Sequence, residues 1–127
     1  MADVEDVRRL ALGLPETTER PSYGTPGFRV KDRLFARLRF DGGGRGAPAD
    51  AGEEVLVLMC GSIEEKQALI ASEPRKFFTT SHYDEYPMVL VRLARVGARE
   101  LRELLVEAWL ARAPKRVRAA HEEGLGS

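Results

Sequence analysis

Residues 28–40 read FRVKDRLFARLRF, and this stretch decides the fold because apolar and basic side chains alternate on both sides of a short polar break. Successive side chains of a strand point to opposite faces of a sheet, so the pattern predicts two antiparallel strands joined by a tight turn at residues 31–33. The apolar face carries Phe28, Val30, Leu34, Ala36, Leu38 and Phe40. The opposite face carries Arg29, Lys31, Phe35, Arg37 and Arg39.

Further strands and helices are predicted on either side of this hairpin. Strands are expected at residues 19–23, 54–60 and 88–94, and helices at residues 3–14, 62–72 and 98–112. Apolar residues recur at helical spacing in the first and last helices, and Asp3 and Ser62 stand where N-caps are expected. The order α-β-β-β-β-α-β-α lacks a repeated βαβ unit. It therefore predicts an α+β fold, with a single antiparallel sheet of about five strands, helices packed on one face and the other face open.

The length of 127 residues and the hydrophobic content of 43% predict one packed domain. We expect it to span residues 1–118, with a flexible tail at residues 119–127 and a glycine-rich loop at residues 41–53. The formal net charge is zero, so an anionic partner would have to be bound by a local patch of positive charge. The sequence shows neither a signal peptide nor an apolar run of the ~20 residues that cross a membrane, so a cytoplasmic protein is expected.

The sequence contains no assembled catalytic motif, so we expect a non-enzymatic protein without a cofactor or a metal ion. It has no GxxxxGK[ST] loop, no GxSxG elbow and no HExxH helix. Cys60 is the only cysteine and lies in the apolar run VLVLMC, where a buried, unreactive thiol is expected. His82 lies close to Asp84 and Glu85, but neighbouring loop residues seldom converge on one ion. This group is expected to be a solvated or hydrogen-bonded loop, with a metal or catalytic role as the alternative.

Three aromatic residues are expected to serve packing rather than ligand binding. Trp109 lies on the apolar stripe of the last helix, together with Leu101 and Leu105, and should pack that helix on the sheet. Tyr83 and Tyr86 lie in the connection at residues 75–86, and both are expected to anchor it on the core.

Every charge on the face opposite the apolar residues is positive, and three roles remain open for this face. It could keep the sheet soluble, bind the phosphates of DNA weakly through guanidinium groups, or form a protein or dimer interface. The candidate DNA-binding residues are Arg29, Lys31, Arg37, Arg39 and Arg92, with Lys115 and Arg116 as additional candidates. The candidate interface anchors are Phe35, Met88 and Leu90. Weak DNA binding is the leading functional hypothesis.

Five stretches, taken in order, carry a family resemblance: LALGLPETTE (10–19), YGTPGFRVKDRLFARL (23–38), EPRKFF (73–78), VLVRL (89–93) and ELRELLVEAWLARAPKR (100–116). Together they resemble the MmcQ/YjbR-like family of small bacterial proteins. The resemblance implies an α+β fold likened to type III secretion chaperones and frataxin-like sheets. It also implies DNA binding through a proposed "double wing" surface, without a substrate or cofactor. The sequence departs from the family at Gly97, where the last helix usually has an Asp N-cap, and in the longer loop at residues 41–53.

Overall fold

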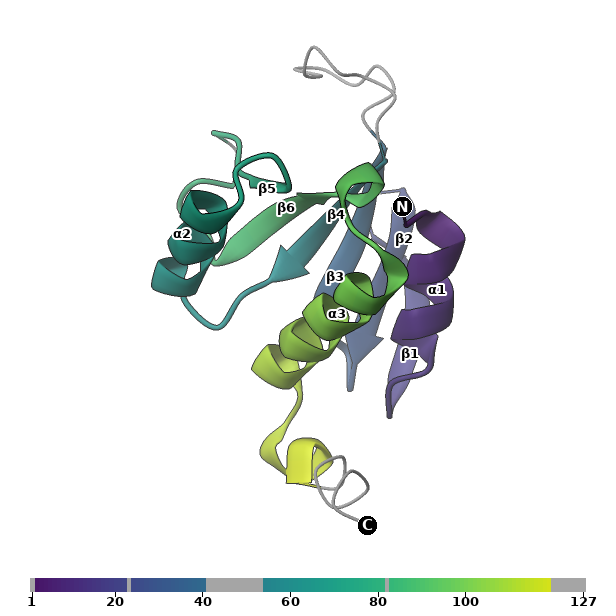
Figure 1. Ribbon diagram of the computed structural model, residues 1–127. Coiled ribbons are helices and arrows are strands. Elements are labelled where there is room, and N and C mark those ends of the chain that lie inside the picture. The colour runs from purple at the N-terminus through teal and green to yellow at the C-terminus, as the bar shows by residue number, and fades with distance from the viewer. Residues whose placement is uncertain (1, 23, 41–53, 82, 120–127) are drawn as a thin grey trace.

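The computed structural model describes residues 2–22, 24–40, 54–81 and 83–119, which form one antiparallel sheet with helices on one face (Figure 1). The strands are β1 (Thr17–Ser22), β2 (Thr25–Val30), β3 (Arg33–Phe40), β4 (Glu54–Met59), β5 (Phe77–Phe78) and β6 (Met88–Arg92), in the spatial order β1-β2-β3-β4-β6-β5. The helices are α1 (Val4–Leu12), α2 (Ile63–Ser72) and α3 (Ala98–Arg112), with a 3-10 turn η1 (Leu93–Arg95) before α3. The α+β fold expected from the sequence is confirmed.

The bounds of the helices and strands differ from expectation at element ends and in one short strand. β5 raises the number of strands in the sheet from about five to six, and its two residues are too few to show an alternating pattern. The strand expected at residues 88–94 ends at Arg92, where η1 begins. The loop expected at residues 41–53 and residues 120–127 of the expected tail lie outside the described residues.

The N-termini of α1 and α2 are capped as their sequences predict. Asp3 Oδ1 accepts a hydrogen bond from the Asp6 amide at 2.9 Å, and Asp6 Oδ2 accepts one from the Asp3 amide at 3.1 Å. At α2, Ser62 Oγ accepts from the Glu65 amide at 3.1 Å, whereas the Glu65 carboxylate accepts from the Gly61 amide at 2.9 Å. These bonds satisfy amides that a helix N-terminus leaves without an intrahelical acceptor, so both helices begin where the sequence indicates.

A β-bulge in β3 interrupts the alternation that the sequence suggests. Phe28 pairs with Ala36, but the next residue, Arg29, pairs with Leu34, which leaves Phe35 as an extra residue on β3. The bulge turns Phe35 into the core beneath the helices, where it is fully buried. The expectation that Phe35 shares a face with the arginines is therefore wrong. Leu34 takes that position instead, because directly paired residues of two strands share a face.

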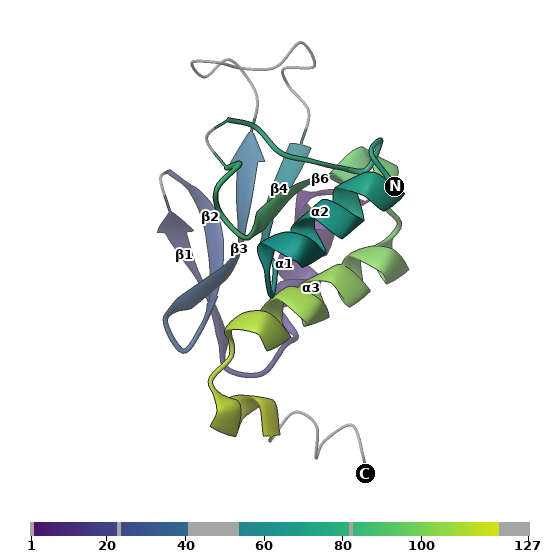
Figure 2. The same ribbon diagram turned by 90° about the vertical axis from the view of Figure 1, so that its left-hand side faces the viewer.

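The main core, which we call the helix-side core, lies between the sheet and the helices. Its largest fully buried side chains include Trp109, Phe28, Phe35, Phe77, Leu38 and Leu56. Figure 2 shows α2 and α3 running in similar directions over this face of the sheet. Residues 115–119 form a further helical turn, and its buried Val117 packs into the same core. This last helical turn is therefore packed against the domain through Val117, whereas Arg118 and Ala119 after it are exposed.

The turn between β2 and β3 has a backbone conformation that suits Lys31 poorly. Lys31 and Asp32 both have a positive φ, 48° and 67°, which is what a two-residue type I′ turn requires. Glycine adopts this left-handed conformation readily and asparagine tolerates it, whereas most other residues are strained by about 1–2 kcal/mol. The turn therefore stores strain at Lys31.

We expect Lys31→Asn to be more stable than Lys31→Val by about 1–2 kcal/mol, because asparagine tolerates a positive φ and a β-branched residue does not. Both substitutions remove the exposed ion pair between Lys31 Nζ and Glu16 Oε2 (3.1 Å), so the loss of that pair cancels in the comparison. The free energy of unfolding in urea measures the difference. Equal values for the two variants would contradict the left-handed conformation at this position.

Candidate nucleic-acid interface

Strand pairing places five arginines on the sheet face opposite the helix-side core. Arg20 and Arg37 flank the same residue of β2, and Arg39 and Arg92 flank the same residue of β4. Arg29 lies on this face as well, two residues further along β2. We call this set the arginine face: Arg20, Arg29, Arg37, Arg39 and Arg92. The sequence predicts all of these except Arg20, which it misses because β1 (TTERPS) has no alternating apolar residues.

At the hairpin end of the arginine face, Asp32 accepts hydrogen bonds from two arginines. Arg20 donates a hydrogen bond to Asp32 Oδ1 at 2.7 Å, and Arg29 donates to the Asp32 carbonyl oxygen at 3.3 Å. The Arg20–Asp32 ion pair is exposed to solvent, so it contributes at most ~1 kcal/mol and an anionic ligand could replace it.

In the middle of the arginine face, two guanidinium groups are oriented by aromatic side chains. Arg37 donates a hydrogen bond to the Tyr83 hydroxyl. The Arg92 guanidinium lies over the Phe78 ring, 4.3 Å from its centroid, which is a cation–π arrangement. These two contacts fix the direction in which the guanidinium groups point.

The arginine face is partly covered, which the sequence does not predict. The connection from β5 to β6 crosses it, and Tyr83 lies only 6% exposed against Val55, Val57 and Leu90. The expectation of a fully open face is therefore wrong, because these apolar positions of β4 and β6 form a second small core. The expected anchoring by Tyr83 is confirmed. Tyr86 is 52% exposed, so the same expectation for its ring is wrong.

Lys66 of α2 holds this covering segment in place. Its ammonium donates hydrogen bonds to the backbone carbonyls of Tyr83 at 2.5 Å, Tyr86 at 2.9 Å and Asp84 at 3.4 Å. Lys66 is only 2% exposed, and its burial lowers its pKa below the usual 10.5, although the charge of Asp84 opposes the shift. In the sequence, IEEKQALIAS reads as an ordinary helix, and no signal marks this lysine as buried.

Three of the expected basic residues lie away from the arginine face. Lys31 is in the β2–β3 turn, where its ammonium pairs with Glu16 Oε2 at 3.1 Å. Lys115 and Arg116 are exposed on the helical turn that follows α3, and this turn packs into the helix-side core through Val117. The structure therefore does not bring these three cations together with the five arginines.

The expected interface anchors do not form an exposed apolar patch. Phe35 is fully buried in the helix-side core because of the bulge in β3. Leu90 lies on the arginine face but is fully buried in the cluster that contains Tyr83, and Met88 is half-buried beside it. A partner protein would therefore find little apolar surface at these positions.

The remaining candidates for chemistry offer little in the described part of the chain. Cys60 is partly buried, and burial raises its pKa to about 11, so its thiol remains protonated at neutral pH. His82 lies outside the described residues, and its neighbours Asp84 and Glu85 are exposed. Among the described residues, no three His, Cys, Asp or Glu side chains are grouped so that they could hold a metal ion. None of the described helices is long and apolar enough to cross a membrane.

Similarity to known proteins extends over nearly the whole chain. The model of the YjbR family matches residues 12–111. The uncharacterized protein Rv2570 of Mycobacterium tuberculosis is 42% identical over 123 residues, which cover 92% of this chain and 93% of that protein. The uncharacterized protein Mb2600 of Mycobacterium bovis matches over the same length with the same identity.

A solved structure shares the fold. The crystal structure of protein DR2400 of Deinococcus radiodurans, a DUF419 protein, aligns with a TM-score of 0.63 over 87% of this chain and 78% of that one. The sequences are 24% identical, so this likeness concerns the fold alone. The match to the family model and the mycobacterial relatives confirm the resemblance seen in the sequence: the chain belongs to the YjbR family.

Proposed function

We propose that this YjbR-family protein is a non-enzymatic DNA-binding protein that uses the arginine face to contact the phosphate backbone. The observation that carries the proposal is the gathering of five guanidinium groups on one face of β1, β2, β3 and β6. Among the described strand residues that share this face, none is acidic. The gathering of five cationic side chains on one face supports binding of a polyanion by a protein whose formal net charge is zero.

The chemistry of the arginine face suits phosphate better than base edges. Guanidinium groups bind phosphate oxygens in a bidentate way, and those of Arg37 and Arg92 are already oriented by Tyr83 and Phe78. The face lies on a sheet that is partly covered by the β5–β6 connection, and among the described residues no helix projects from it to enter a groove. We therefore expect weak, sequence-tolerant binding that depends strongly on salt.

Fluorescence anisotropy with a labelled DNA duplex tests this proposal. With three or four phosphate contacts, raising the salt from about 50 to about 200 mM should weaken binding about 40- to 150-fold, because each contact contributes ~0.9 to the logarithmic slope. The variant Arg29→Gln/Arg92→Gln should lower that slope by about two. The control Arg99→Gln/Arg102→Gln removes the same charge from exposed positions on α3 and should leave the slope unchanged.

Two results would contradict the proposal. Absence of binding at about 50 mM salt would exclude a DNA-binding role, and equal losses in both double variants would show that the arginine face is not the contact surface. The labelled duplex should also be recovered at full length after incubation with the protein and Mg²⁺. A shortened duplex would contradict the proposal that the protein is not an enzyme.

The proposal places the protein in the bacterial cytoplasm, where DNA is accessible.

A protein or dimer interface on the same face is less well supported. Its expected anchors Phe35 and Leu90 are fully buried, and Met88 is half-buried. The exposed positions that remain are mainly charged or polar, whereas the centre of a stable interface is usually apolar and depleted of charge.

A further inference from the structure

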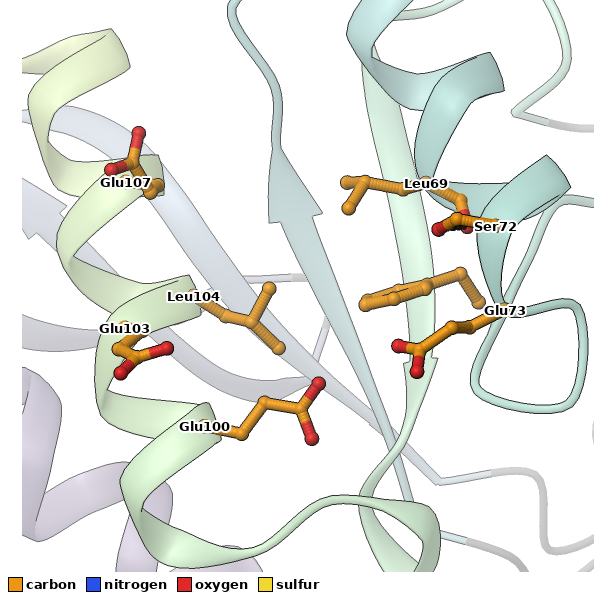
Figure 3. A pocket seen from close by; sticks show the side chains of 8 residues that line it. Leu69, Ser72, Glu73, Glu100, Glu103, Leu104 and Glu107 are labelled. Carbon is orange, nitrogen blue, oxygen red and sulfur yellow. Dashed lines mark hydrogen bonds between the residues drawn. The ribbon is translucent and has the colours of Figure 1, made fainter.

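The structure contains a second surface feature on the helix side of the sheet, a groove of about 390 Å³ between α2 and α3 (Figure 3). Its apolar lining comes from Leu69, Leu104 and Phe77, and Figure 3 shows Leu69 and Leu104 pointing toward each other across it. Its acidic lining consists of Glu73, Glu100, Glu103 and Glu107. An apolar floor with carboxylates at its rim is thus built from two helices.

A second hollow adjoins the groove at the end nearer the start of α2. A smaller hollow of about 60 Å³ shares Leu69, Leu104 and Glu107 with it and extends to Cys60 and Glu65. Along α3, the lining runs from residue 100 to residue 108, which is about 12 Å, or two helical turns. The groove is therefore elongated and follows the direction of the helices.

The charge of the groove is balanced at one end only. Lys76 Nζ lies 3.0 Å from Glu73 Oε2 and 2.8 Å from Glu100 Oε2, and these bonds raise its pKa. Glu103 and Glu107 are exposed one turn apart on α3, and in the described ranges no cation lies within ion-pair distance of either. Like charges at this spacing destabilise a helix, and a cationic ligand would relieve that repulsion.

We propose that this groove binds a cationic amphipathic helix of a partner protein. Apolar side chains at i, i+3 and i+4 of that helix would rest on Leu69, Leu104 and Phe77, and its Lys or Arg residues would pair with the Glu103 and Glu107 carboxylates. Charge complementarity favours this occupant, because the acidic rim repels nucleic acid and anionic lipid. The proposal goes beyond DNA binding and does not depend on it, since the groove lies on the opposite side of the sheet from the arginine face.

Anisotropy with a labelled synthetic peptide of about 14 residues tests this directly, with leucines at helical spacing and lysines elsewhere. The peptide should bind more weakly as salt is raised, and a matched peptide with glutamate in place of lysine should not bind. Glu103→Gln/Glu107→Gln should weaken binding about five- to tenfold. The control Glu64→Gln/Glu85→Gln removes two exposed carboxylates outside the groove and should change it less than about twofold.

Amide chemical shifts locate the bound peptide and identify other occupants. Shifts should change at residues 69–73 and 100–108, and shifts confined to other elements would overturn the proposal. Equal weakening in the two double variants would also overturn it, because it would show that only net charge matters. Sedimentation of the protein alone is the second check: a dimer that Glu103→Gln/Glu107→Gln dissociates would assign the groove to a second copy of the chain instead.

Discussion

Replacing Trp109 with alanine should lower the free energy of unfolding by about 3–5 kcal/mol, which is a large part of the stability of a domain of this size. Trp109 has the largest side chain among the fully buried residues, and it is 0% exposed in the helix-side core. Its Nε1 also donates a hydrogen bond to the Pro15 carbonyl oxygen at 3.0 Å, which ties α3 to the segment between α1 and β1. The substitution removes both the packing and this bond.

Two further substitutions make the result interpretable. Trp109→Phe keeps most of the apolar volume but leaves the Pro15 carbonyl without its donor, so we expect a smaller loss of about 1–3 kcal/mol. Leu110→Ala changes the next residue, which is only partly buried, and should cost less than Trp109→Ala. Urea unfolding must be followed by circular dichroism, because Trp109 is the only tryptophan. A loss below about 1.5 kcal/mol in Trp109→Ala would contradict the central place of this side chain in the core.

Lys66→Met should lower the free energy of unfolding by about 2–3 kcal/mol, although it replaces a charged residue with an apolar one of similar length. The methionine cannot donate to the carbonyls of residues 83, 84 and 86, so the segment that covers the arginine face loses its link to α2. Amides of residues 83–88 should then exchange with solvent faster than in the wild type. The exposed Lys115→Met is the control and should change stability by less than about 0.5 kcal/mol.

The pH dependence of the same variant provides a separate check. Because burial lowers the pKa of Lys66, the unfolded chain binds this proton more tightly than the folded chain does. The contribution of Lys66 to the free energy of unfolding therefore rises with pH between its lowered pKa in the folded state and about 10.5, its usual pKa in the unfolded chain. Lys66→Met lacks that rise, so its deficit relative to the wild type should widen as the pH is raised. The comparison is best made in a Cys60→Ala background, which removes the nearby thiol with a pKa of about 11. A constant deficit would contradict the lowered pKa.

Periodicity and capping residues predict most of the fold because they are local signals. Asp3, Ser62 and the stripe on α3 lead to three helices whose starts agree with the structure to within about two residues. The face predicted for Phe35 is wrong because one extra residue in β3 reverses the alternation of side chains along the strand. No residue type in the sequence marks the position of such a bulge. β5 escapes prediction because its two residues gain their strand conformation only by pairing with β6.

Of the two candidate surfaces, the sequence predicts only those residues whose face follows from their alternation along a strand. Arg29, Arg37, Arg39 and Arg92 can be assigned to one face from their positions in the strands alone. The cover provided by Tyr83 and the buried ammonium of Lys66 depend on how a long connection folds back over the sheet. The groove depends on where α2 and α3 meet, and α3's acidic stripe by itself reads as an ordinary solvent-facing surface.

The positions of β1 and β5 at the two ends of the sheet determine how this protein can be approached. β5 has only two residues, and β1 carries Pro21 among charged and polar residues, so neither border is a good template for an added strand. Extension of the sheet into a neighbouring molecule is therefore disfavoured, and with it the fibril growth that open borders permit. Among the described parts of the chain, we therefore expect association to use the broad surfaces above and below the sheet, where the two charged regions of opposite sign lie.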